Sequence, residues 1–128
     1  MTTPRRIVAI TGTRADYGPM EPVYRAIARD PGLDLHLVVT GMHWLPEFAS
    51  SLVQVQEDAY GTLHELPTIG DGDTGRAMAE ALGRALHGIG GILARIEPDI
   101  VLLQGDRGEM LAGAIALPVS PSPIVGSS

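Results

Sequence analysis

The sequence contains no cysteine and no lysine, and each absence excludes a class of protein. Without cysteine the chain can form neither a disulfide framework nor a thiolate metal site, and it fits a reducing cytoplasm. All nine strongly basic residues are arginines, and the net charge is −6, so a broad nucleic-acid-binding surface is not expected. We therefore expect any recognition of phosphate to be local.

Long hydrophobic runs are also missing. No segment approaches the length of a membrane span, and the apolar run after Arg5 and Arg6 is too short for the core of a signal peptide. A chain of 128 residues with 45% hydrophobic content suits one domain with a modest core. We expect a soluble cytoplasmic protein that binds neither nucleic acid nor membranes.

Apolar runs alternate with segments of helical periodicity along the chain. Strands are expected at residues 7–10, 33–39, 62–66 and 100–103. A first helix is expected to begin near Pro19, with an apolar face of Met20, Val23, Tyr24, Ile27 and Ala28. A second is expected through Phe48, Leu52 and Val55, and two more over residues 75–96 and 110–117. This β-α order predicts a Rossmann-like parallel sheet with right-handed crossovers and helices on both faces.

The expected helix over residues 75–96 is the longest, and its interior is rich in glycine. Each interior glycine costs about 1 kcal/mol relative to alanine. The interior glycines are Gly83, Gly88, Gly90 and Gly91. Their number indicates that the helix approaches a neighbouring backbone closely, or that it breaks near Gly90.

The first strand ends at Gly12, and polar residues follow it. Thr13 or Asp16 can cap the next helix, whose free backbone N–H groups and positive end form a natural anion site. Arg14 lies in this turn and would add a planar cation suited to phosphate or carboxylate. The alternative is an ordinary strand-to-helix turn with a solvated arginine. The glycine spacing does not fit the dinucleotide fingerprint, so NAD is disfavoured.

Ligands of such sheets bind beyond the carboxyl ends of the strands, where the strand order reverses. Three loops should meet there: residues 12–18, 40–44 and 105–109. Together they carry groups that can hold an anion and move a proton: Arg14, Asp16, His43, Asp106, Arg107 and Glu109.

Each of these residues also has an alternative interpretation. Asp106 can cap the helix after it, Arg107 and Glu109 can pair with other loops, and His43 can pack or cap. The other three histidines have no special spacing, so no metal site is expected: His36, His64 and His87.

Four motifs at these loops resemble the N-terminal domain of UDP-N-acetylglucosamine 2-epimerases. They are Gly-Thr-Arg-Ala-Asp-Tyr-Gly at 12–18, Val-Thr-Gly-Met-His at 39–43, Pro-Glu-Phe at 46–48 and Gly-Asp-Arg-x-Glu-Met-Leu at 105–111. The first two look more like the hydrolysing branch, which makes N-acetylmannosamine for sialic-acid-type sugars. The match covers roughly residues 6 to 116, and its strength lies in the combination of motifs.

The resemblance implies one half of a two-domain fold of glycosyltransferase-B type, with a UDP-sugar bound between the halves. UDP is eliminated after loss of the C2 proton, and water adds to the resulting 2-acetamidoglucal. No cofactor or metal is required. The residues implied at the diphosphate and substrate are Arg14, Gly12, Thr13, Asp16 and Arg107, and those implied in or beside the chemistry are Asp106, Glu109 and His43.

The sequence departs from the family after residue 116. Residues 1–116 correspond to the N-terminal half-domain, and residues 117–128 form a proline- and serine-rich tail in which Ile124 and Val125 can at best add an edge strand. One hypothesis for the tail is a frameshift in the gene. The family's second, UDP-binding domain and one catalytic glutamate are absent from the sequence, so activity by this chain alone is expected to be incomplete.

Completion of the site would come from a homo-oligomer or a partner chain that supplies the C-terminal half. Two other functions fit the residues: a non-catalytic nucleotide-sugar-binding or interaction module, and one subunit of a split glycosyltransferase-B enzyme.

Overall fold

The computed structural model describes residues 3–67, 75–104 and 124–127. Its centre is a five-stranded sheet in the order β3-β2-β1-β4-β5, and every adjacent pair is parallel. The strands are β1 (Arg5–Thr11), β2 (Leu33–Val39), β3 (Thr62–Glu65), β4 (Ile100–Gln104) and β5 (Ile124–Ser127). The expected Rossmann-like α/β class is confirmed.

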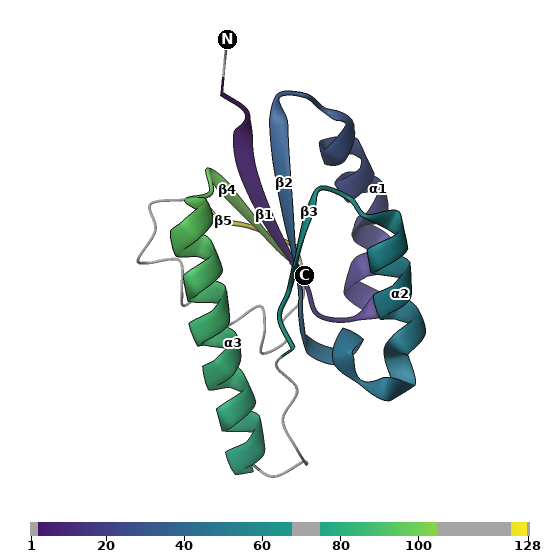
Figure 1. Cartoon of the computed structure of the whole chain (residues 1–128), viewed down its shortest axis with the longest axis vertical. Coiled ribbons are helices and arrows are strands. Elements are labelled where there is room, and N and C mark those ends of the chain that lie inside the picture. Colours follow the sequence, from purple (N-terminus) through teal and green to yellow (C-terminus); the bar gives the residue numbers. More distant parts are fainter. Residues whose placement is uncertain (1–2, 68–74, 105–123, 128) are drawn as a thin grey trace.

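Helices cover both faces of the sheet (Figure 1). The helices α1 (Arg14–Arg29) and α2 (Ala49–Asp58) lie on one face, and α3 (Gly75–Ile96) lies on the other. Alternation along β1 separates two cores, because successive side chains of a strand point to opposite faces. Ile7 and Ala9 pack with the residues of α1 and α2, while Val8 and Ile10 pack against α3.

The first helix begins earlier than the sequence indicated. It starts at Arg14 with Thr13 as its N-cap, and Pro19 and Pro22 lie inside it. The two prolines lack N–H donors, but the Thr13 cap and the burial of Tyr17 compensate for the missing bonds. The expected apolar face is corrected as well: Tyr24 and Ile27 are buried, whereas Val23 and Ala28 are exposed.

The region after β2, where residues 40–44 were expected to form a loop, contains two short 3₁₀ turns, η1 (Gly41–Trp44) and η2 (Pro46–Phe48). The following helix α2 confirms the expected helical segment. A tight turn then leads into β3, with Ala59 at φ 48° and Gly61 at φ 68°.

The glycines of α3 do not have the role expected of them. The helix is continuous through Gly90, so it does not break there. A side chain at Gly83, Gly90 or Gly91 would meet nothing within 4 Å, and only Gly88 of these four lies against a neighbour, the side chain of Leu66.

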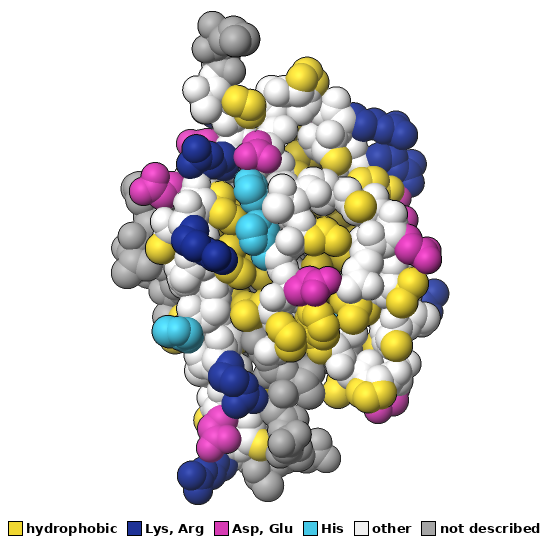
Figure 2. All heavy atoms as spheres, viewed as in Figure 1, with side chains coloured by type: hydrophobic (Ala, Val, Ile, Leu, Met, Phe, Trp, Pro, Cys, Tyr) yellow, Lys and Arg dark blue, Asp and Glu magenta, His cyan; other side chains and the backbone are white. Residues whose placement is uncertain are grey.

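Arginine side chains are spaced along the exposed side of α3 (Figure 2).

The tail adds β5 beside β4, with Ile124 opposite Val101, so the expected edge strand is confirmed. The helix expected at 110–117 lies outside the described residues. Among the helices that the structure describes, none has the length and apolar character needed to cross a bilayer.

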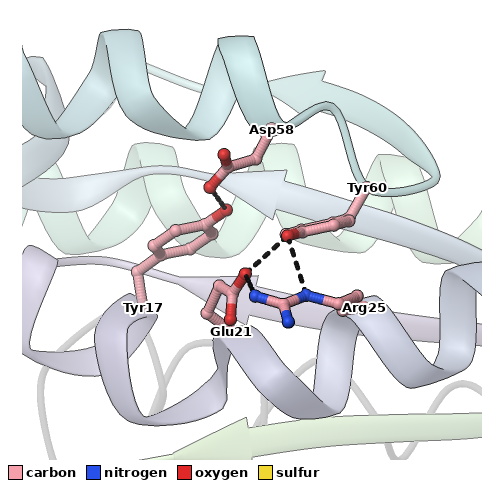
Figure 3. A network of polar contacts seen from close by, with 5 residues as sticks. All are labelled: Tyr17, Glu21, Arg25, Asp58 and Tyr60. Atoms are coloured by element: carbon pink, nitrogen blue, oxygen red, sulfur yellow. Dashed lines mark hydrogen bonds and ion pairs between the residues drawn. The ribbon is translucent and has the colours of Figure 1, made fainter.

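A polar network joins α1 to the end of α2 (Figure 3). Tyr17 Oη donates to Asp58 Oδ2 at 2.6 Å, while Tyr60 and Arg25 both bind Glu21. Burial, followed by the hydrogen bond to Asp58, raises the pKa of Tyr17, so this phenol remains a donor. The hydrogen bonds from Tyr60 and Arg25 lower the pKa of Glu21. The network holds α1 against the end of α2.

Candidate functional site

The strand order places the candidate site at the carboxyl end of β1. The connections from β1 and β2 lead toward β3, whereas α3 carries the chain back across the sheet to β4. The order therefore reverses between β1 and β4, where open α/β sheets bind their ligands. The last residue of β1 and the first residue after β2 meet at this edge, since Thr40 N–H donates to Thr11 O at 3.0 Å.

The N-terminus of α1 stands at this edge. Thr13 Oγ1 accepts from Asp16 N–H at 3.0 Å, which satisfies one of the first-turn donors. The N–H groups of Arg14 and Ala15 precede any intrahelical acceptor, and no acceptor among the described residues contacts them, so they can bind a ligand. Arg14 is exposed at the first helical position, so its guanidinium can reach the same ligand. This arrangement can bind an anion through both backbone and side chain.

A buried hydrogen-bond relay supports this end of β1. His43 is 1% exposed and lies between two hydroxyl groups. Thr11 Oγ1 is 3.0 Å from His43 Nε2, and Ser51 Oγ is 3.0 Å from His43 Nδ1. Tyr17 packs edge-on against the imidazole with 6.5 Å between ring centroids. The relay ties β1 to η1 and to the first turn of α2.

The hydrogen-bond network assigns the tautomer of His43. Ser51 donates its hydroxyl proton to Phe48 O at 2.8 Å, so Ser51 Oγ must accept from His43 Nδ1–H. The Nε2 atom then carries the lone pair and accepts from Thr11. This neutral imidazole has no free nitrogen for proton transfer, and the geometry therefore favours its role in supporting the pocket.

Acidification should weaken the fold through His43. Burial lowers the pKa of this histidine below 6.5, and the opposing charge of Asp16 is the smaller influence. The unfolded chain therefore binds the proton more readily, so the stability contributed by neutral His43 is full above pH 6.5 and falls below it. We expect the difference in free energy of unfolding between wild type and His43→Gln to narrow between pH 7.5 and 5.5.

Urea unfolding at several pH values measures this difference. The same measurements on His64→Gln serve as the control, because burial also lowers the pKa of His64 and this histidine can contribute its own pH dependence. A difference for His43→Gln that stays constant over this range would contradict the expectation.

The structure places most of the sequence-predicted site residues at this edge. Gly12, Thr13, Asp16 and His43 are buried there, and Arg14 is exposed beside them. Asp106, Arg107 and Glu109 lie outside the described residues, so their roles remain predictions. In the part of the chain that the structure describes, no three His, Cys, Asp or Glu side chains are placed to hold a metal ion.

Sequence reasoning missed two sets of residues. Thr11 and Ser51 had no recognisable spacing, because their partnership depends on how the loops fold. His36 and His64 form a second pair, with His36 Nδ1 3.0 Å from His64 Nε2 and Asp34 bound to the other nitrogen of His36. His36 and His64 lie on adjacent parallel strands, two register positions apart and therefore on the same face of the sheet. This spacing was a usable signal for the pair.

Comparison with known proteins is consistent with this geometry. The family model for UDP-N-acetylglucosamine 2-epimerase matches residues 25–124. A UDP-N,N'-diacetylbacillosamine 2-epimerase (hydrolyzing) of Legionella pneumophila is 38% identical over 88% of this chain and 30% of its own length. A UDP-N-acetylglucosamine 2-epimerase of Neisseria meningitidis is 38% identical over 86% of this chain and 28% of its own length.

A solved structure agrees as well. The Methanocaldococcus jannaschii UDP-GlcNAc 2-epimerase, in complex with UDP-GlcNAc and UDP, superposes with a TM-score of 0.75 at 25% identity. That match covers 94% of this chain and 32% of the other. The chain spans less than a third of the length of the Legionella and Neisseria relatives. Because the family model matches well over half of its residues, the chain belongs to the UDP-N-acetylglucosamine 2-epimerase family.

Proposed function

We propose that this chain is the N-terminal, Rossmann-like part of a hydrolysing UDP-N-acetylglucosamine 2-epimerase. The reaction would convert UDP-N-acetylglucosamine to N-acetylmannosamine and UDP. The observation that carries the proposal is the capped N-terminus of α1 at the carboxyl end of β1, where the strand order reverses, with Arg14 at the first helical position. Its donors and its cation suit the diphosphate of a nucleotide sugar.

The proposed chemistry is an elimination followed by hydration. Loss of the C2 proton and departure of UDP from C1 would leave a 2-acetamidoglucal, to which water adds to give N-acetylmannosamine. Arg14 and the first-turn N–H groups would stabilise the charge that develops on the departing UDP. Asp106 is proposed as an acid, base or sugar-positioning carboxylate, with Arg107 at the phosphates and Glu109 beside the sugar. His43 would support the pocket through Thr11.

The chain spans less than a third of the length of the Legionella and Neisseria relatives, so the complete activity is proposed only for an assembly that contains the second half. That half would hold the uridine and close the cleft. A closed, water-poor site is where positioned charges are most effective in catalysis. A homo-oligomer or a separate chain could supply it.

Binding of UDP tests the proposal. We expect the wild-type chain to bind UDP weakly in calorimetry, through the diphosphate, and Arg14→Ala to weaken binding by about ten- to a hundred-fold, the worth of a charge-assisted hydrogen bond. Arg29→Ala is the matched control, since Arg29 lies in the last turn of the same helix. No binding by wild type, or equal losses in the two variants, would refute the proposed site.

The product identifies the branch. With the C-terminal half of a relative added, free N-acetylmannosamine and UDP are expected from UDP-N-acetylglucosamine. A sugar that remains linked to UDP after inversion at C2 would instead place the chain in the non-hydrolysing branch.

A further inference from the structure

The buried polar side chains of the described residues are concentrated in one place. All of them belong to the end of β1, to the N-cap and first turn of α1, or to the stretch from the end of β2 to the first turn of α2: Thr11, Thr13, Asp16, Thr40, His43 and Ser51. Thr11, His43 and Ser51 form the relay, and Thr13 caps α1. Asp16 differs from these four residues because one of its carboxylate oxygens has no hydrogen-bond partner among the described residues.

One oxygen of the Asp16 carboxylate is buried without a hydrogen-bond donor among the described residues. The residue is 8% exposed, and its Oδ2 is the one fully buried side-chain oxygen or nitrogen in the described part of the chain that lacks a partner. The backbone N–H of Asp16, by contrast, is satisfied by Thr13. A buried, unpaired carboxylate oxygen is costly, and proteins rarely retain one unless a donor arrives from outside the fold.

The position of Asp16 fixes where that donor must come from. Asp16 is the third residue of α1 and directly follows Arg14 and Ala15, whose N–H groups have no intrahelical acceptor. The next residue, Tyr17, packs edge-on against the His43 ring, so Asp16 lies in the part of α1 nearest η1, and its charge opposes the lowering of the His43 pKa by burial. Asp16 is therefore close to both the anion site and the buried relay.

The chemistry of a carboxylate restricts the kind of group that it can accept. A phosphate offers no donor at neutral pH and would repel Asp16, so the two cannot contact each other directly. Arg14 is exposed, and no ion pair joins it to Asp16 within the described residues. A neutral ligand group with O–H or N–H donors satisfies the oxygen without a charge conflict.

We infer that Asp16 accepts a hydrogen bond from a hydroxyl or amide N–H of the sugar moiety of the nucleotide sugar, and that it selects the sugar-bearing ligand over the bare nucleotide. This inference rests on the proposed function and refines the sequence-based grouping of Asp16 with the phosphate contacts. The end of α1 then has two functions: Arg14 and the free N–H groups hold the diphosphate, and Asp16 positions the sugar.

Paired binding measurements on the full chain test the inference. The quantity is the ratio of the Kd for UDP to the Kd for UDP-N-acetylglucosamine, measured by calorimetry. We expect Asp16→Ala to lower this ratio by about ten- to a hundred-fold while the Kd for UDP changes little. Asp16→Asn keeps an acceptor oxygen and should lower it less. Glu57→Gln, on the exposed side of α2, controls for the loss of a negative charge.

The possible outcomes separate this inference from the proposed function. If the wild-type chain binds neither ligand, both fail. If wild type binds UDP but gains nothing from the sugar, or if Asp16→Ala weakens both ligands equally, the proposed function stands and the sugar contact is overturned. Circular dichroism shows whether Asp16→Ala remains folded, and Asp16→Asn, nearly the same size, decides the case if it does not.

Discussion

Replacement of Gly61 by alanine is expected to destabilise the fold by about 2–4 kcal/mol. Gly61 has φ 68°, which is unfavourable for a residue with a Cβ atom by about 1–2 kcal/mol. An added Cβ would also collide with the backbone carbonyl of Leu35 and lie 2.8 Å from the Leu35 Cβ. Leu35 is 2% exposed in β2, so neither partner can move without disturbing the sheet.

Urea unfolding followed by circular dichroism measures the loss. Gly91→Ala is the control, because this exposed glycine of α3 has nothing within 4 Å of its would-be Cβ. The control should gain about 0.5–1 kcal/mol, the usual advantage of alanine in a helix. If Gly61→Ala unfolds at the wild-type urea concentration, the turn before β3 has a different backbone.

The second large effect is expected from His43→Ala. Removal of the imidazole leaves a cavity in a buried region and takes away the acceptor of the Thr11 hydroxyl and the donor to Ser51. The combined cost is about 2–4 kcal/mol. His87→Ala removes the same group from an exposed position in α3 and should change stability by less than about 0.5 kcal/mol.

A conservative variant separates the relay from simple packing. In His43→Gln the side-chain oxygen can still accept from Thr11, so part of the stability should return. Equal losses for the alanine and glutamine variants would mean that the ring fills space and that its hydrogen bonds contribute little. Comparable losses for His43→Ala and His87→Ala would contradict the buried relay altogether.

The fold was predictable where one strong signal decided it. The apolar run at 7–10 and the helical periodicity of 75–96 specify a central strand and a long helix, and both are present. The start of α1 was missed because local rules conflicted there. Pro19 indicated a helix start, whereas the Thr13 cap and the buried Tyr17 favour an earlier one, and capping with burial prevails.

The site was predictable at the level of loops but not of contacts. The strand-end rule brings the Thr13 turn and the His43 turn together without any knowledge of side chains. The relay from Thr11 through His43 to Ser51 depends on the two 3₁₀ turns after β2, for which the sequence has no distinctive pattern. The orphaned oxygen of Asp16 likewise emerges only once its surroundings are known.

The central position of β1 has a consequence for the order of folding. Its neighbour β2 follows after one helix, whereas contacts with the β4 side join residues as distant as Arg6 and Asp99, 93 positions apart. During synthesis the first βαβ unit can therefore form while one edge of β1 still has no neighbour. Closing so long a loop is entropically expensive and slow, so the nascent chain must carry an exposed, aggregation-prone strand edge until β4 emerges.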